Sequence, residues 1–378
     1  MNGVLASIVV PARNEEASLD ACLRSLIAQS GVDFEIVVVD DDSSDRTRQI
    51  ALSFPGVRVI DAPPLPQGWV GKNNALVAGA EAARGEWLLF TDADTVHLPG
   101  SLARAIAEAR HRGAALLSYS PRQEVHGLLQ SAVMPVIFAE LATTYRPSRI
   151  SDPASGAAAA NGQYLLITRA AYGAVGGHRA VASSLLEDVA LARSVKASGR
   201  KIFFRYAGDA VHTRMYRSFS QLAEGWTKNL ALLFPSPLRL AVLRLTEFVL
   251  ILGSAALALS CGLRGQLRPA VVAAIVCATL YAFFLRRIGR AHFAWYATIL
   301  SLAGLPLFSY LLRRSVISHR NGAVTWKGRT YAQSGSAGAA LKESAGNRRA
   351  AKVARNMSSG PAKLAGPRPD AREKEWSI

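Results

Sequence analysis

The chain has 378 residues, half of them hydrophobic, and a formal net charge of +17 at pH 7. The charge is uneven, because residues 262–378 carry 19 Lys and Arg against 4 Asp and Glu, whereas residues 1–261 are nearly neutral. A basic end beside long apolar runs indicates an anionic membrane surface rather than nucleic acid, and three widely spaced cysteines exclude a metal knuckle and a disulfide framework.

The first 60 residues alternate between apolar strands and amphipathic helices. Residues 7–11 predict a buried strand, and they are too short for the apolar core of a signal peptide. Apolar side chains at helical spacing predict helices over residues 18–29 and 46–54, while residues 34–39 and 57–60 predict two more strands. We therefore expect the N-terminal part of the chain to stay in the cytoplasm.

The same alternation continues to residue 119 and indicates the fold class. Helices are predicted over residues 75–83 and 102–112, and strands over residues 88–90 and 115–119. Alternating strands and helices, with polar groups at the strand ends, are typical of an α/β fold with a doubly wound sheet. In such sheets ligands bind beyond the carboxyl ends of the strands, so we expect the site there.

The second half of the chain is more apolar. Residues 128–142 form an apolar segment that contains Pro135, for which we expect a helix at the membrane interface rather than a span. Residues 161–167 and 201–206 predict strands on either side of a helix over residues 187–196.

From residue 238 the composition changes to long apolar runs. The runs over residues 269–285 and 293–312 are near or at the length that spans a bilayer. The run over residues 248–261 reaches that length only if its helix extends back past Glu247 and Arg244. We therefore predict three parts, which are a catalytic domain over 1–234, two or three transmembrane helices within 235–315, and a basic juxtamembrane segment with a disordered tail over 316–378.

Acidic residues follow two of the predicted strands. Asp40, Asp41 and Asp42 come at the end of the second strand, where a carboxylate can hydrogen-bond a nucleobase or a ribose. Asp92 and Asp94 end the fourth strand, and at positions i and i+2 of a strand they would point to the same face. Two such carboxylates suit a hard divalent cation held together with phosphate oxygens. Each cluster is also open to a plainer interpretation as a solvated acidic turn.

Two further groups are expected at this edge of the sheet. Lys72 follows a glycine-containing turn and can donate to phosphate oxygens, or it is an ordinary surface lysine. Glu187 and Asp188 begin a predicted helix, where the macrodipole alone favours acidic residues. The functional interpretation is that this acidic pair supplies a general base.

Five segments of the chain are similar to the motifs of family 2 glycosyltransferases with the GT-A fold, and they occur in the family's order. They are residues 9–15, 39–47, 71–76, 91–94 and 186–191. Each is weak alone, but together they are specific. Within the family the chain resembles the hopanoid-associated and carotenoid glycosyltransferases, and more distantly the ceramide glucosyltransferases. The segments that support this narrower resemblance are residues 64–69, 225–229 and 324–331.

The resemblance implies a nucleotide-sugar donor, a membrane lipid acceptor such as a hopanoid or carotenoid, and Mg²⁺ or Mn²⁺. Asp94, with Asp92, would hold the metal ion on the donor diphosphate, where the ion acts as a Lewis acid. His212 falls where some of these enzymes add a metal ligand, although a structural histidine is the plainer interpretation. The implied donor-binding residues are Pro11, Arg13, Glu15, Asp40, Asp41, Asp42, Lys72 and Asp92.

The resemblance also implies a single displacement with inversion at the anomeric carbon. Asp188 would deprotonate the acceptor hydroxyl, and Glu187 would support it. The residues implied on the acceptor side are Asn161, Gly162 and Trp226.

One departure from the family pattern bears on the reaction. Processive members carry a Gln-x-x-Arg-Trp motif near the end of the catalytic domain, whereas residues 224–226 of this chain are Glu-Gly-Trp, without the arginine. This argues against a polysaccharide synthase and for the transfer of one sugar. It leaves the stabilisation of the pyrophosphate to Lys72, Lys228 or Arg214.

Nucleotide sugars are cytoplasmic, so we expect a multi-pass protein of a bacterial-type inner membrane whose catalytic domain faces the cytoplasm. Three spans would place Arg313, Arg314 and Arg320 outside, against the positive-inside rule, whereas the loop at residues 286–290 would agree with it. Two and three spans therefore both stay open. Nothing in the sequence indicates an oligomeric state.

Other functions fit parts of the sequence. A glycosyltransferase of cell-surface polysaccharide or glycan synthesis would use the same motifs. Residues 92–95 also match the Asp-x-Asp-x-Thr motif of haloacid dehalogenase-type phosphatases, but that motif follows the first strand, and here three strands precede it. A non-catalytic membrane scaffold has no support, because every carboxylate that catalysis needs is present.

Overall fold

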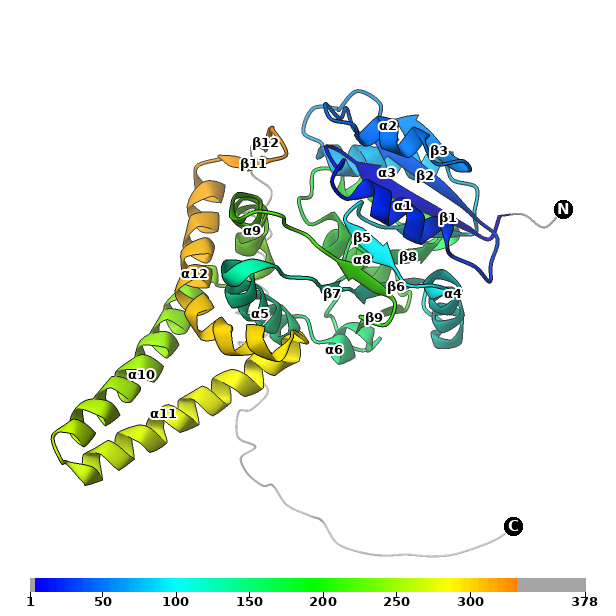
Figure 1. Cartoon of the computed structure of the whole chain (residues 1–378). Coiled ribbons are helices and arrows are strands. Elements are labelled where there is room, and N and C mark those ends of the chain that lie inside the picture. Colours follow the sequence, from blue (N-terminus) through cyan, green and yellow to red (C-terminus); the bar gives the residue numbers. More distant parts are fainter. Residues whose placement is uncertain (1–3, 332–378) are drawn as a thin grey trace, which may run out of the picture. The chain divides into compact units, whose positions relative to one another are not determined.

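The computed structural model describes residues 4–331, and the predicted disordered tail lies outside them. Its core is a seven-stranded sheet in the order β3-β2-β1-β4-β8-β6-β9 (Figure 1). Neighbouring strands are parallel, except that β8 runs antiparallel to both β4 and β6. The strands are β1 (Ala6–Ala12), β2 (Phe34–Asp40), β3 (Val57–Asp61), β4 (Trp87–Phe90), β6 (Leu116–Ser120), β8 (Leu165–Thr168) and β9 (Ile202–Tyr206). The predicted α/β fold is confirmed.

Helices cover both faces of this sheet, because its central strands are apolar on both sides. Ile8 and Val10 of β1 belong to the core under one face, whereas Val9 belongs to the core under the other. The helices that supply the first core are α1 (Leu19–Ile27) and α4 (Ser101–Arg112), and those that supply the second are α3 (Gly71–Ala82) and α8 (Glu187–Ala197). Shorter helices in this part are α2 (Thr47–Leu52), α6 (Pro147–Ser151), α7 (Arg169–Ala174) and η1 (Gly177–Val181).

A small three-stranded sheet lies beyond the end of β4. It consists of β5 (Thr95–His97), β10 (Val211–Thr213) and β7 (Arg122–Gln123). Because β4 ends at Phe90 and β5 begins at Thr95, Asp92 and Asp94 lie in the turn between two strands. The expectation that they share one face of a strand is therefore wrong, although they do lie at the carboxyl end of β4.

Two predicted helices are longer than expected. The helix α3 begins at Gly71 rather than at residue 75, so Lys72 lies in its first turn. The helix α5 (Gly127–Thr144) continues through Pro135, and its apolar side chains are buried together with those of α9 (Phe219–Leu233) and of the last apolar helix.

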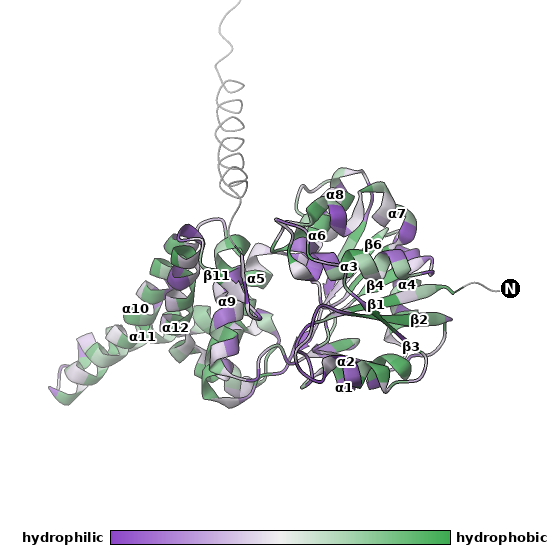
Figure 2. Cartoon of the chain, turned by 90° about the horizontal axis from the view of Figure 1, so that it is seen from above, coloured by the Kyte–Doolittle hydropathy of each residue, from purple (hydrophilic) through white to green (hydrophobic). Residues whose placement is uncertain are grey.

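Four helices within residues 4–331 are long and apolar enough to cross a membrane, judged by length and composition. They are α5 continued by α6 (Gly127–Ser151), α10 (Pro237–Leu263), α11 (Leu267–Ile288) and α12 (Trp295–Arg320). The antiparallel pair α10 and α11 exposes most of its apolar side chains, which Figure 2 shows in green. The prediction of two or three spans, with α5 at the interface, stays a prediction.

Charged residues on these helices form one buried cluster. Glu247 of α10 accepts hydrogen bonds of 2.6 Å from Arg244 and 2.8 Å from Arg287 of α11. Glu140 of α5 lies 3.0 Å from Arg244 and 3.2 Å from Arg287. Mutual pairing reduces the cost of placing charges among apolar helices. The helix α10 therefore does extend back past Glu247 and Arg244, as the spanning length requires.

After α12 the chain forms a hairpin of β11 (Val324–Trp326) and β12 (Arg329–Tyr331). The two turn residues, Lys327 and Gly328, have φ angles of 47° and 77°, which is the geometry of a two-residue hairpin turn with both central residues left-handed. The hairpin contacts α9 through β11. These residues lie within the segment predicted as juxtamembrane.

Candidate active site

A cavity of about 760 Å³ lies at the carboxyl ends of β1, β2 and β4. The polar residues that line it include Arg13, Glu15, Asp41, Lys72, Asp92, Asp94, Asn161, Gln163, Glu187, Asp188, Lys228, Asn229, Arg286, Arg290, His292, Lys327 and Arg329. The apolar part of its wall comes from α5 and α9 and includes Phe138, Leu141, Tyr145, Trp226 and Leu233. Pro11 and Gly162 also line it. Residues from five sequence-distant motifs therefore meet in one place.

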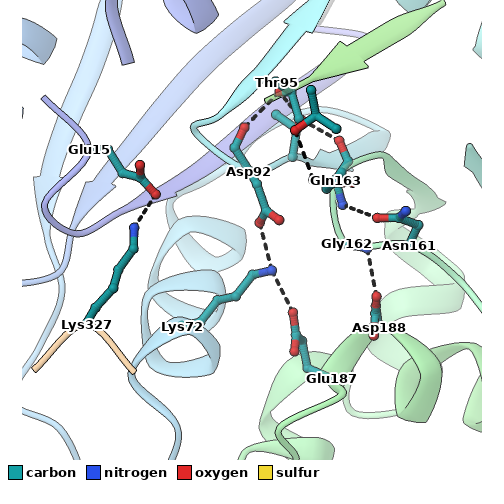
Figure 3. A network of polar contacts seen from close by, with 12 residues as sticks. Glu15, Lys72, Asp92, Thr95, Asn161, Gly162, Gln163, Glu187, Asp188 and Lys327 are labelled. Carbon is teal, nitrogen blue, oxygen red and sulfur yellow. Dashed lines mark hydrogen bonds and ion pairs between the residues drawn. The ribbon is translucent and has the colours of Figure 1, made fainter. Parts of the chain in front are cut away.

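The turn after β4 carries an acid pair at the bottom of the cavity. The hydroxyl of Thr95 donates to the backbone carbonyl of Asp92 over 2.8 Å and fixes this turn (Figure 3). Burial and the charges of Asp92 and Glu15 raise the pKa of Asp94 to about 7. The buried Oδ1 of Asp94 has no hydrogen-bond partner within residues 4–331. Asp94 therefore has a free oxygen and an unfavourable negative charge.

The acid pair fits a divalent cation that also binds a ligand. No group of three or more His, Cys, Asp and Glu side chains among the described residues could hold a metal ion. A cation here would take the carboxylates of Asp92 and Asp94 and fill its remaining positions with phosphate and water oxygens. The free Oδ1 of Asp94 is the atom best suited, because Asp92 Oδ1 already pairs with Lys72.

Lys72 connects two sides of the cavity. Its Nζ lies 2.7 Å from Oδ1 of Asp92 and 2.8 Å from Oε1 of Glu187 (Figure 3). Although burial opposes its charge, Asp92 and Glu187 raise the pKa of Lys72 well above its ordinary value. Burial alone would raise the pKa of Glu187, but the charges of Lys72 and Lys228 outweigh burial, and the pKa is lowered. The interpretation of Lys72 as an ordinary surface lysine is therefore wrong.

Asp188 is held in a fixed orientation at the start of α8. The backbone N–H of Gly162 donates to its Oδ2 over 2.8 Å (Figure 3). The N–H of Val189 donates to its Oδ1 over 2.7 Å. Burial and the adjacent charge of Glu187 raise the pKa of Asp188 to about 7. A positioned carboxylate with a pKa near the working pH is suited to accept a proton.

Of the three acids after β2, Asp41 lines the cavity, whereas Asp40 and Asp42 do not. Asp42 has a φ of 58° and a side chain that is 90% exposed. The guanidinium of Arg13 donates to the backbone carbonyls of Asp41 and Asp42 over 2.5 Å and 2.9 Å, which fixes this loop. The structure therefore favours Asp41 as the donor-side acid.

The three residues implied on the acceptor side play different parts. Asn161 accepts a 2.9 Å hydrogen bond from the N–H of Gln163 and shapes the turn that aims the N–H of Gly162 at Asp188. Trp226 is buried, and its indole N–H points to the sulfur of Met134 at 3.3 Å. Trp226 therefore contributes apolar wall, and its N–H is engaged inside the protein.

Two of the other implied residues do not line the cavity. His212 is not among the residues that line it, and its Nε2 lies 2.9 Å from the carbonyl oxygen of Gly208, which supports the interpretation as a structural histidine. Arg214 does not line it either, whereas Lys228 does. Of the cations expected to stabilise a pyrophosphate, Lys72 and Lys228 therefore remain.

The sequence patterns did not reveal that the hairpin after α12 reaches this cavity. Lys327 pairs with Glu15, and Arg329 pairs with Asp41 (Figure 3 shows the first pair). The partners are 312 and 288 residues apart in the chain, so no local pattern could have joined them. The patterns also did not reveal that the link between α11 and α12, the 3-10 helix η2 (Gly289–Ala291), lines the same cavity.

Comparison with known proteins gives consistent matches. Residues 7–148 match the family model described as glycosyl transferase family 2. A 4,4'-diaponeurosporenoate glycosyltransferase of Staphylococcus aureus (strain USA300) is 28% identical over 341 residues, which cover 86% of this chain and 88% of that protein. The protein of the same description from Staphylococcus haemolyticus (strain JCSC1435) is 31% identical over 233 residues, and the match spans 60% of its length and 60% of this chain.

Solved structures that are similar to this chain include two complexes with nucleotide sugars. The mannosyltransferase PcManGT from Pyrobaculum calidifontis, in complex with GDP-Man and Mn²⁺, is 15% identical with a TM-score of 0.49, over 83% of this chain and 86% of that one. Residues 1–349 of TarS from S. aureus, in complex with UDP-GlcNAc, are 17% identical with a TM-score of 0.41, over 84% of this chain and 92% of that one.

Proposed function

Since this chain is a family 2 glycosyltransferase, we propose that it transfers one sugar from a nucleoside diphosphate donor to a hydroxyl group of a membrane lipid. The observation that carries this proposal is the shared cavity, which is lined by the acid pair Asp92 and Asp94, by the oriented carboxylate of Asp188 and by apolar helices. The match of residues 7–148 to the family model argues against the phosphatase alternative.

The donor would lie between β2 and the turn after β4. Asp41, in a loop fixed by Arg13, would bind the nucleoside, and Lys72 and Lys228 would face the diphosphate. Asp94, together with Asp92, would hold Mg²⁺ or Mn²⁺. The bound ion would stabilise the negative charge that develops on the leaving nucleoside diphosphate.

The transfer would be a single displacement with inversion at the anomeric carbon. The acceptor oxygen forms a bond to that carbon while the bond to the nucleoside diphosphate breaks. Asp188 takes the proton of the acceptor hydroxyl, and its bonds from Gly162 and Val189 support a fixed orientation towards that hydroxyl. Glu187 supports the reaction indirectly, because its charge raises the pKa of Asp188.

A lipid acceptor is supported by the apolar wall of the cavity. Phe138 and Leu141 of α5 and Leu233 of α9 line it, and so do residues of η2 between two helices of membrane-spanning length. The relatives described as 4,4'-diaponeurosporenoate glycosyltransferases support a carotenoid or a lipid of similar kind, such as a hopanoid. We expect a bacterial inner membrane, with the catalytic domain on the cytoplasmic side, where nucleotide sugars occur.

The test compares membranes that contain the full chain with membranes that lack it. The full chain is expressed in a heterologous host, and it is also returned to a strain of the source organism from which its gene has been deleted. Membranes are incubated with UDP-, GDP- and dTDP-sugars and with lipid extract, and products are identified by mass spectrometry. We expect a lipid heavier by one sugar residue, formed only while Mg²⁺ or Mn²⁺ is present. An unchanged lipid profile together with a changed polysaccharide would instead favour a role in cell-surface glycan synthesis.

A further inference from the structure

The hairpin of β11 and β12 follows α12, the last apolar helix. It brings the cations Lys327 and Arg329 into the cavity. The ammonium group of Lys327 pairs with Glu15 and donates to the backbone carbonyl of Arg13 over 2.9 Å. The guanidinium of Arg329 binds both carboxylate oxygens of Asp41, the second over 3.1 Å. Both partners belong to the donor side of the cavity.

Lys327 and Arg329 line the same cavity as the acid pair Asp92 and Asp94, where the diphosphate of the donor is proposed to bind. Lys327 is close enough to the acid pair that its charge counteracts the rise in the pKa of Asp94. Of the two lining cations expected from the sequence, Lys72 and Lys228, the first is already shared between Asp92 and Glu187. A nucleoside diphosphate brings two or more negative charges into a site that already holds several carboxylates, so it needs cations beyond Lys72.

The hairpin is held in place by its turn and by its contact with α9. Lys327 is the first central residue of the two-residue turn, which accounts for its left-handed conformation. The ring of Trp326 lies 5.1 Å from the ammonium group of Lys228. A Cβ atom at Gly71 would lie 1.8 Å from Nη1 of Arg329, so the guanidinium lies against this residue, and a larger side chain would displace it.

Arg329 therefore lies directly against the first residue of α3. The start of a helix carries partial positive charge and free backbone N–H groups, which favour phosphate. The guanidinium and the N-terminus of α3 together make this a suitable place for a phosphate group.

We propose that Lys327 and Arg329 bind the diphosphate of the donor, so that the hairpin at residues 324–331 completes the donor site. This inference rests on the proposed glycosyl transfer. In the donor-free arrangement Glu15 and Asp41 neutralise the two cations. Donor binding exchanges these carboxylates for phosphate oxygens and releases Asp41 to bind the nucleoside. The two cations thereby take the part of the arginine that this chain lacks before Trp226.

The test measures binding to the full chain in detergent by calorimetry, with UDP, GDP, ADP and dTDP in the presence of Mg²⁺, and with the corresponding nucleosides. For the diphosphate that the wild type binds best, Lys327→Ala and Arg329→Ala should each weaken binding about tenfold or more, the size of one charge-assisted hydrogen bond. Binding of the nucleoside should be unchanged in Lys327→Ala, and unchanged or tighter in Arg329→Ala, because Asp41 is freed.

The ratio of the affinity for the nucleoside diphosphate to the affinity for the nucleoside separates a phosphate contact from a structural effect. Loss of a phosphate contact lowers this ratio, whereas a structural effect weakens both affinities equally. Thr330→Ala is the matched control, because Thr330 is exposed on the same hairpin and does not line the cavity. Unchanged diphosphate binding in both alanine variants, or an equal loss for diphosphate and nucleoside, would overturn the inference while the glycosyltransferase proposal stands. If the wild type binds none of the four diphosphates, the proposed function fails and this inference fails with it.

Discussion

Lys72 and Glu187 form an ion pair of 2.8 Å across the cavity, and the same ammonium group lies 2.7 Å from Asp92 (Figure 3). This lysine therefore joins the acid pair on the donor side to the two acids at the start of α8. Its charge also counteracts the rise in the pKa of Asp188. Lys72 thus influences both halves of the proposed reaction.

Replacing Lys72 by Met should lower kcat/KM about 100-fold, because one positioned cation facing the leaving group is lost. The acid side of the pH–rate profile should also move to higher pH, since Lys72 lowers the pKa of Asp188. Lys72→Arg keeps the charge and serves as the control. A Met variant with an unmoved profile would show that Lys72 and Asp188 are not coupled.

Asp188→Asn should strongly reduce the rate of sugar transfer and leave the affinity for the donor unchanged. The amide cannot accept the acceptor proton, so turnover should fall about 100-fold or more. Donor binding, measured by calorimetry, should stay at the wild-type value because Asp188 faces the acceptor. Asp20→Asn, on the exposed side of α1, is the matched control. Retained turnover in Asp188→Asn would remove this residue as the base.

The reaction should lose rate as the pH falls below about 7. Asp188, whose pKa is raised to about 7, accepts a proton only when it is ionised, so kcat/KM should rise with pH up to that value and then level off. Glu187 raises this pKa, so Glu187→Gln should move the midpoint to lower pH. A midpoint that stays in place in this variant would contradict the assignment.

Asp94→Asn should weaken the binding of the metal ion. Removal of one carboxylate ligand should raise the Mn²⁺ concentration needed for half-maximal activity about tenfold or more, in line with the effect of losing charge-assisted contacts. Metal titration after chelation measures this, with Asp33→Asn at an exposed loop position as the control. Full activity of the wild type in excess chelator would refute the metal site.

The charged cluster between α5, α10 and α11 should stabilise the apolar helices. Arg287→Ala leaves Glu140 and Glu247 with fewer partners in a buried place, which should cost about 3 kcal/mol of unfolding free energy. Thermal unfolding in detergent measures this loss. Arg264→Ala, exposed after α10, should have little effect. Equal stability of both variants would mean that the cluster contributes nothing.

Local patterns in the sequence were sufficient for most of the fold. The alternation of apolar runs and helical spacing located β1, β2, β3 and the helices between them, because these periods are set by backbone geometry within a few residues. The start of one helix was missed, because α3 begins at Gly71 rather than at residue 75. The helix predicted over residues 128–142 extends over Gly127–Thr144 and runs through Pro135, and its apolar side chains are buried by neighbouring helices.

The candidate site was found from the sequence for a similar reason. Parallel strands end at one edge of a sheet, so the acids that follow β2 and β4 and the charged residues in the first turns of α3 and α8 were expected to converge there. Which of them face the cavity depended on side-chain direction. The structure favours Asp41 over its neighbours, turns His212 to Gly208 and places Arg214 outside the cavity.

The sequence by itself predicted the α/β fold, the resemblance to family 2 glycosyltransferases and the acids of the candidate site, because each depends on short segments in a particular order along the chain. The tertiary structure alone decided that Lys327 and Arg329 meet Glu15 and Asp41, and that Lys72 bridges two acids. Those contacts join residues up to 312 positions apart, and only the packing of the chain after its apolar helices brings them together.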